Sequence, residues 1–83
     1  MQGLKITNHI HWRDSWSQQI AAQLEIRDSS YDFLVFAPRH ERRDVEAVLR
    51  EIPREFYELI EVDETSTDNC ELWTDAGQCY HRH

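Results

Sequence analysis

Hydrophobic and polar residues alternate along the first part of the chain. From Leu4 to Trp12 the large apolar residues share one parity, interrupted only by Asn8, while His9 and His11 fall on the other. A period of two is typical of a strand with one buried face. The sequence therefore predicts a strand across this stretch, with the two histidines together on its polar face.

Two later segments repeat their apolar residues at helical spacing. From Trp16 to Leu24 an apolar residue recurs every four positions. Ser15 and Gln18 match the capping-box pattern, so a helix is expected to begin near Ser15. Valine, leucine and isoleucine at helical spacing predict a second helix over residues 42–52, which a proline ends.

Further segments read as strands. Residues 33–37 form an unbroken apolar run, which is typical of a central strand. Residues 58–63 alternate apolar side chains with acids. Residues 71–74 and 78–81 flank a turn at 75–77, whose glycine supplies the positive φ that a short connection needs. The C-terminal part is therefore expected to be a meander.

These elements predict one domain over residues 1–83, because 83 residues are too few for two. The order β-α-β-α-β-β-β belongs to the α/β (α+β) class. We expect a small two-layer sandwich, with two helices on one face of a mixed β-sheet of four to five strands. The first strand and the strand at 33–37 are expected to be adjacent and parallel, joined by a right-handed helical crossover.

Composition narrows the class of protein. The chain is 40% hydrophobic with only two glycines and two prolines, which argues against intrinsic disorder. No apolar run approaches the roughly 18 residues that cross a bilayer, and the first residues do not resemble a secretion signal. We therefore expect a cytoplasmic protein without membrane contact, with Cys70 and Cys79 reduced.

The net charge is −7, and most of it is local. Residues 1–52 carry seven basic and eight acidic side chains, whereas residues 53–83 carry two basic and eight acidic ones. This balance opposes direct binding to nucleic acid. The acidic charge is concentrated in the C-terminal third.

No motif in the sequence indicates a reaction. The serines lie outside any Gly-x-Ser-x-Gly turn, so we expect no catalytic residue and no enzyme activity. Alternating thiol and imidazole groups on the last strand are a weak zinc pattern, but no Cys-x-x-Cys pair accompanies them. We predict no metal or cofactor site, with a metal-binding module as the alternative; its ligands would come from His9, His11, Cys79, His81 and His83.

Basic residues surround the start of the second predicted helix. Arg39, His40, Arg42 and Arg43 could receive a phosphate or carboxylate there. Acidic residues sit within the same cluster, however, and no glycine lets a phosphate approach the backbone. A solvated segment with local ion pairs is therefore favoured over a second contact site.

Acids and aromatic residues are interleaved in the C-terminal third, a composition that suits docking onto a basic protein surface. We expect a small acidic, non-enzymatic binding protein that inhibits a larger basic, nucleic-acid-handling protein or ribonucleoprotein. Inhibitors of the phage or mobile-element anti-defence type (anti-CRISPR or anti-restriction) have this size and charge. An antitoxin or immunity-type protein, or a regulatory module, is the alternative. The predicted contact residues are Glu58, Glu61, Asp63, Glu64, Asp68, Glu71, Trp73 and Asp75.

Overall fold

The computed structural model describes residues 1–66, 68 and 70–82. In chain order its elements are β1 (Gln2–Ile6), α1 (Asp14–Gln23), β2 (Ile26–Ser29), β3 (Phe33–Phe36), α2 (Arg42–Val48), η1 (Arg54–Phe56), β4 (Tyr57–Glu64), β5 (Leu72–Trp73) and β6 (Cys79–Arg82). The α+β class with two helices is confirmed, as are the strand expected at 58–63 and the C-terminal hairpin. None of the helices formed by the described residues is long and apolar enough to cross a membrane.

The six strands form one sheet in the order β2-β3-β1-β4-β6-β5, and every neighbouring pair is antiparallel. The sheet thus has more strands than the four to five expected and is not mixed. Strands β1 and β3 are neighbours, as predicted, but they run antiparallel. The reason is β2, which the sequence analysis missed: the chain leaves α1, runs along β2 and turns back into β3.

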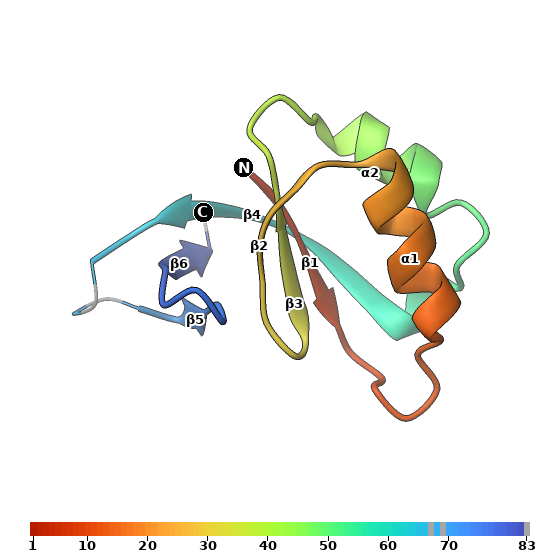
Figure 1. The fold of residues 1–83 in the computed structure, drawn as a ribbon, viewed down its shortest axis with the longest axis horizontal. Helices are drawn as coiled ribbons and strands as arrows, with labels where there is room; N and C mark the ends of the chain where they lie inside the picture. Colours follow the sequence, from red (N-terminus) through yellow and green to blue (C-terminus); the bar gives the residue numbers. More distant parts are fainter. Residues whose placement is uncertain (67, 69, 83) are drawn as a thin grey trace.

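The first 64 residues follow a recognised topology. Their order is β-α-β-β-α-β, and their four strands lie as β2-β3-β1-β4. Each helix therefore connects two parallel strands that have a third strand between them, which is the split β-α-β arrangement of ferredoxin-like domains. Both helices lie together at one end of the molecule, and the β5–β6 hairpin lies at the other (Figure 1). Because this topology serves many functions, it names none.

The helix boundaries differ from the predicted ones for local reasons. Helix α1 begins one residue before Ser15, which lies inside the helix, and no side chain caps its N-terminus. The predicted capping box is therefore wrong there, and Ser17 instead accepts a hydrogen bond of 2.8 Å from the indole of Trp12. Helix α2 ends at Val48 rather than near residue 52. A residue that precedes proline avoids the helical conformation, so the last turn before Pro53 unwinds.

The predicted strand over residues 4–12 ends at Ile6. Beyond it the chain forms a turn, in which the amide of Trp12 donates to the carbonyl of His9. His9 and His11 therefore do not share a strand face, and Ile10 is 90% exposed. The alternation continues past Ile6, but the partner strand β4 begins opposite that residue. The amide of Thr7 still donates to the carbonyl of Phe56, just before β4, and the chain then turns away.

Two hydrophobic cores lie on opposite faces of the sheet. The core under the helices contains Leu4, Ile6, Ile20, Leu24, Phe36, Val45, Leu49 and Ile52. The hairpin core on the other face contains Phe33, Val35, Ile60, Val62 and Tyr80. A strand presents alternate residues to its two faces, so β1 contributes to the helix core with its even residues. Gly3 faces the hairpin core, where a Cβ atom would lie 3.1 Å from Phe33 and 3.3 Å from Ile60.

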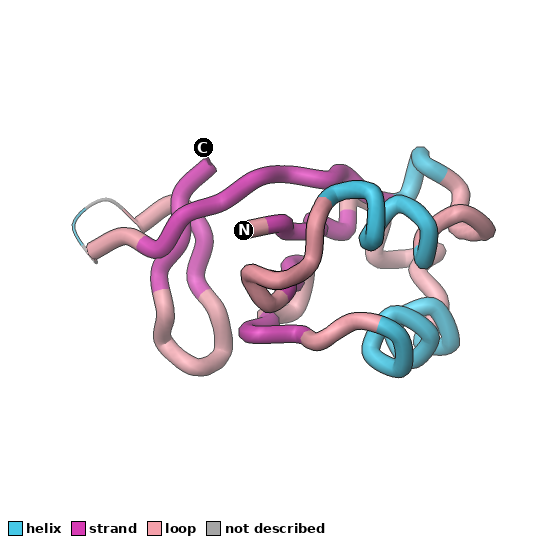
Figure 2. Tube along the Cα trace, turned by 90° about the horizontal axis from the view of Figure 1, so that it is seen from above, coloured by secondary structure: helices cyan, strands magenta, loops and turns pink. Residues whose placement is uncertain are grey.

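The sheet curls so that its two ends meet around the hairpin core (Figure 2). The amide of Asp75, in the β5–β6 turn, donates to the carbonyl of Ser29 on β2 at 2.8 Å. The hydroxyl of Tyr80 on β6 donates to the carboxylate of Asp28, also on β2. The turn itself uses Gly77 with φ of +83°, as the sequence predicted. The hairpin therefore covers the sheet face that the helices leave open.

Candidate binding surfaces

Half of the predicted contact residues lie on β4, where strand alternation divides them between two faces. Glu58 and Glu64 fall on the side of the hairpin core, whereas Glu61 and Asp63 fall on the opposite side. The predicted contact residues therefore do not form one continuous acidic face. The sequence could not show this division, because a charge count along the chain carries no information on direction.

Several of these acids are paired with arginine. The guanidinium of Arg82 lies 3.0 Å from Glu58 and 3.8 Å from Glu71. The guanidinium of Arg27 lies 2.5 Å from Glu64. Because all of these side chains are substantially exposed, each pair is worth only about 0–1 kcal/mol. Their effect is to reduce the free negative charge on this side of the protein.

Other predicted contact residues keep free charges. Within the described residues, the side chains of Glu61, Asp68 and Asp75 have no ion pair. Trp73 lies on the edge strand β5, and its side chain is 51% exposed. Glu71 and Asp75 lie two residues before and after it in the sequence. The structure thus presents a half-exposed tryptophan two residues before Asp75, a carboxylate without an ion pair among the described residues.

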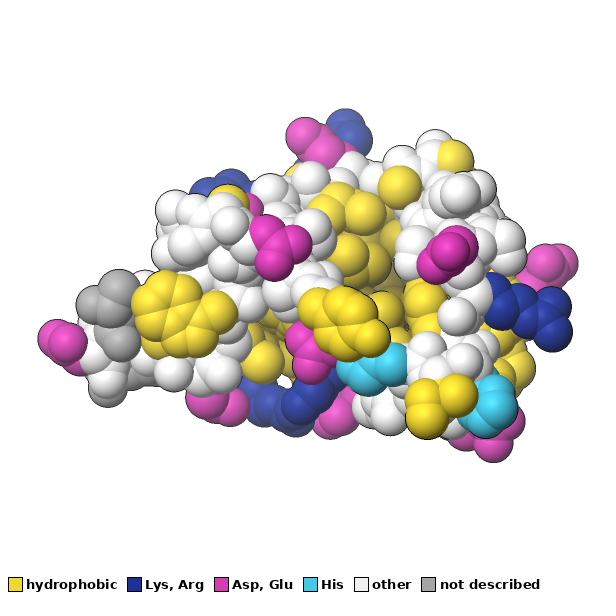
Figure 3. Space-filling model, turned by 60° about the horizontal axis from the view of Figure 1, so that its bottom comes forward, with side chains coloured by type: hydrophobic (Ala, Val, Ile, Leu, Met, Phe, Trp, Pro, Cys, Tyr) yellow, Lys and Arg dark blue, Asp and Glu magenta, His cyan; other side chains and the backbone are white. Residues whose placement is uncertain are grey.

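A further exposed aromatic side chain, Tyr31, lies on the connection next to the same hairpin. Tyr31 is 83% exposed and stacks on His9 with 4.7 Å between ring centroids. The hydrogen bond between Asp75 and Ser29 brings the hairpin turn close to the β2–β3 connection that carries Tyr31. Figure 3 shows separate hydrophobic side chains across one face, with acidic and histidine side chains between them. We name Tyr31, Trp73 and Asp75 the aromatic–acidic surface; the sequence analysis missed Tyr31, which adjoins a turn and carries no periodic signal.

The cysteines and histidines are dispersed or buried. No three metal-ligating side chains gather in the described part of the chain. Burial, with a hydrogen bond to the Cys70 thiol, raises the pKa of Cys79 to about 11. His81 is half-buried on the same strand, and its Nδ1 finds no partner among the described atoms. His83, the remaining candidate ligand on this strand, lies outside the described residues.

The basic residues at the start of α2 form local ion pairs. Arg39 lies 3.1 Å from Glu25, and Arg43 lies 2.8 Å from Glu41. His40 accepts a hydrogen bond from the Glu25 amide. This agrees with the sequence interpretation of a solvated segment.

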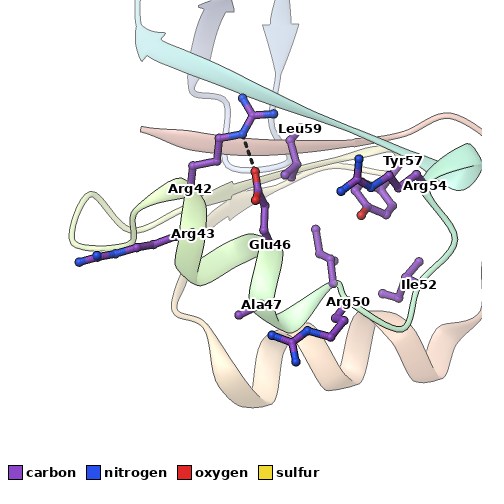
Figure 4. Close-up of a pocket in the computed structure, with 10 residues that line it drawn as sticks. Arg42, Arg43, Glu46, Ala47, Arg50, Ile52, Arg54, Tyr57 and Leu59 are labelled. Carbon is purple, nitrogen blue, oxygen red and sulfur yellow. Dashed lines mark hydrogen bonds and ion pairs between the residues drawn. The ribbon is translucent and has the colours of Figure 1, made fainter.

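A groove beside this segment gathers other arginines. It has a volume of about 500 Å³ and lies between α2, η1 and the first half of β4 (Figure 4). Four of the eight arginines of the protein line this groove, together with one acid. Two half-buried residues of β4, Tyr57 and Leu59, form its floor. The residues that line it are Arg42, Arg43, Glu46, Ala47, Leu49, Arg50, Ile52, Arg54, Tyr57 and Leu59. We name it the arginine groove; the sequence analysis missed it because Arg50 and Arg54 lie outside the cluster that it considered.

Comparisons with protein-family models, curated proteins and solved structures give no match to this chain.

Proposed function

We propose that the protein is a non-enzymatic binding protein that docks through the aromatic–acidic surface onto a basic surface of a larger partner. The observation that carries the proposal is Trp73, which is half-exposed on an edge strand instead of filling either core. Tryptophan and tyrosine are the residues that most often dominate the binding energy of protein interfaces. A partner that covers these two side chains would gain the free energy of burying their apolar area.

The sign of the charge favours a basic partner. Asp75 and Asp68, on either side of Trp73 in the sequence, have no ion pair among the described residues. Residues 53–83 carry eight acids against two basic residues, which would speed association with a positively charged surface at low salt.

Nucleic-acid-handling enzymes and ribonucleoproteins display such lysine- and arginine-lined surfaces. A small acidic protein that covers one of them competes with the nucleic acid. The concrete form of the proposal is therefore an inhibitor, of the anti-CRISPR or anti-restriction type. An antitoxin or immunity-type protein would bind in the same manner.

Affinity purification with matched variants tests the proposal. Wild-type protein, Trp73→Ala with Asp75→Lys, and the control Glu51→Lys are used as baits in a lysate of the native host. Glu51 is an exposed acid at the opposite end of the molecule, without an ion pair among the described residues. We expect a basic nucleic-acid-binding protein to be retained by the wild type and the control, lost with the double variant, and displaced by added nucleic acid. Equal retention by all three baits, or retention that nucleic acid does not affect, would contradict the proposal.

A further inference from the structure

The arginine groove has an excess of positive charge in a protein whose net charge is −7. Arg42 is held by Glu46 at 2.7 Å, and Arg43 pairs with Glu41 and points away from the groove (Figure 4). Arg50 and Arg54 have no carboxylate partner among the described residues. The groove therefore keeps two free guanidinium groups, which are suited to bidentate contact with carboxylates.

The floor of the groove is apolar. Leu49 and Ile52 are buried beneath it, while Leu59 and Tyr57 are half-buried and point from β4 toward α2 (Figure 4). Apolar side chains of a bound molecule could therefore pack on this floor, while its anionic groups contact the arginines at the rim of the groove. This combination suits an amphipathic anion better than a simple inorganic ion.

The same groove borders a free strand edge. Strand β4 pairs with β1 from Tyr57 to Glu61, but with β6 only from Val62 to Glu64. The amide of Val62 donates to Met1 on the β1 side, so the backbone groups of Leu59, three residues earlier, point the other way. No strand of the described residues lies on that side of Leu59. Its N–H and C=O are thus available to a further strand.

We propose that the arginine groove binds an acidic peptide segment of a partner protein in extended conformation. The peptide pairs with the free edge of β4 at Leu59, places apolar side chains on the floor, and directs carboxylates to Arg50 and Arg54. Addition of a strand to an exposed edge is a general mode of peptide recognition, and so is the capture of acidic motifs by arginines. Nucleic acid lacks the amide groups that this edge would pair with.

This site is separate from the aromatic–acidic surface. The groove lies beside α2, and the β5–β6 hairpin lies at the other end of the molecule (Figure 1). The groove is positively charged, whereas the aromatic–acidic surface is negatively charged. Failure of one proposal therefore leaves the other untouched, and Trp73→Ala should not change binding to the groove.

Fluorescence anisotropy with a synthetic probe tests the site. The probe is a fluorescein-labelled peptide of the sequence Glu-Thr-Val-Thr-Val-Thr-Glu, about the length of a typical strand. Its valines and glutamates share one strand face, so the valines can lie on the floor while the glutamates at both ends reach the arginines. We expect this peptide to bind. The same peptide with glutamine in place of glutamate should bind about tenfold more weakly, or not at all. Arg50→Gln with Arg54→Gln should weaken the glutamate peptide to a similar degree. The control Arg39→Gln removes an exposed arginine outside the groove and should have no effect.

Two further peptides examine the strand edge. Methylation of alternate amide nitrogens keeps the carboxylates but removes the donors on one side of the peptide. Of the two methylation patterns, the one that blocks the amides facing β4 should abolish binding. Three results would overturn the proposal: no binding of the glutamate peptide, no effect of the Arg50 and Arg54 substitutions, or equal binding of both methylated peptides. Tighter binding of a single-stranded oligonucleotide at the same arginines would identify a phosphate site instead and would also overturn it.

Discussion

Replacing Tyr80 with phenylalanine should lower the stability of the fold by an amount that depends on pH. Tyr80 is fully buried in the hairpin core, and its hydroxyl donates to the Asp28 carboxylate on β2. Phenylalanine keeps the ring against Phe33, at 6.4 Å between centroids, and removes the hydroxyl with its contacts to Asp28 and Arg27. A hydrogen bond to a charged group is worth about 1.5–3 kcal/mol, so the free energy of unfolding at pH 7 should fall by about that amount.

The pH dependence provides a sharper measure. Burial, followed by the hydrogen bond to Asp28, raises the pKa of Tyr80 from 10.0 to about 12, against an opposing effect of Arg27. The unfolded phenol loses its proton first, so this contribution is complete below pH 10 and is lost as the pH rises toward 12. At pH 11 the wild type should have lost about 1 kcal/mol through this residue, whereas Tyr80→Phe loses nothing there.

Urea unfolding followed by tryptophan fluorescence at pH 7, 9 and 11, under reducing conditions, measures both quantities. The pKa of Cys79, raised to about 11 mainly by burial, falls in the same range, but it affects both proteins equally and cancels in their difference. The stability gap between wild type and Tyr80→Phe should therefore narrow by about 1 kcal/mol between pH 9 and pH 11. Parallel pH profiles would show that the buried phenol is not what makes the fold sensitive to alkali.

Three other substitutions examine the packing. Gly3→Ala should destabilise the protein by about 1 kcal/mol, because the new Cβ would press on Phe33 and Ile60 in a closed core. Thermal unfolding measures this, and a gain in stability would refute the reasoning. Gly77→Ala should lower the stability by about 1 kcal/mol through its φ of +83° alone, since no atom beyond its chain neighbours lies within 4 Å of the added Cβ. Gly77→Asn should recover part of this stability in the same assay, because asparagine tolerates a positive φ. Leu4→Ala truncates a fully buried side chain on the interior strand β1 and should cost about 2–5 kcal/mol in urea unfolding; a cost below 1 kcal/mol would place this residue outside the core.

Much of the fold could be predicted wherever one strong pattern dominated a segment. The apolar run at Phe33–Phe36, the alternation along β4 and the glycine turn of the hairpin each specify their element locally. Strand β2 escaped prediction because Ile26–Ser29 has one apolar residue among four and precedes a serine that reads as a turn. It is a strand because β3 lies beside it and offers backbone partners, which a local pattern does not reveal.

The candidate surfaces were predictable only in part. The acidity of the C-terminal third and the position of Trp73 follow from the sequence, but the pairing of Glu58, Glu64 and Glu71 with arginines does not. The arginine groove depends on η1 bringing Arg54 to face the end of α2, which no spacing rule predicts. Residues far apart in sequence build both surfaces, so tertiary structure decides them.

The strand order also bears on how this chain folds. Of the six strands, β1 is synthesised first, yet it lies in the interior of the sheet. Leu4 finds its partners Leu34 and Leu59 only in segments synthesised much later. Contacts between distant parts of a chain require closing large loops before they stabilise anything, which slows folding. Until β4 is synthesised, one edge of β1 has no hydrogen-bonding partner and the hairpin core lacks Ile60 and Val62. We therefore expect nascent chains stopped before residue 57 to be susceptible to proteases and to collect chaperones, and protection to begin only once β4 is present.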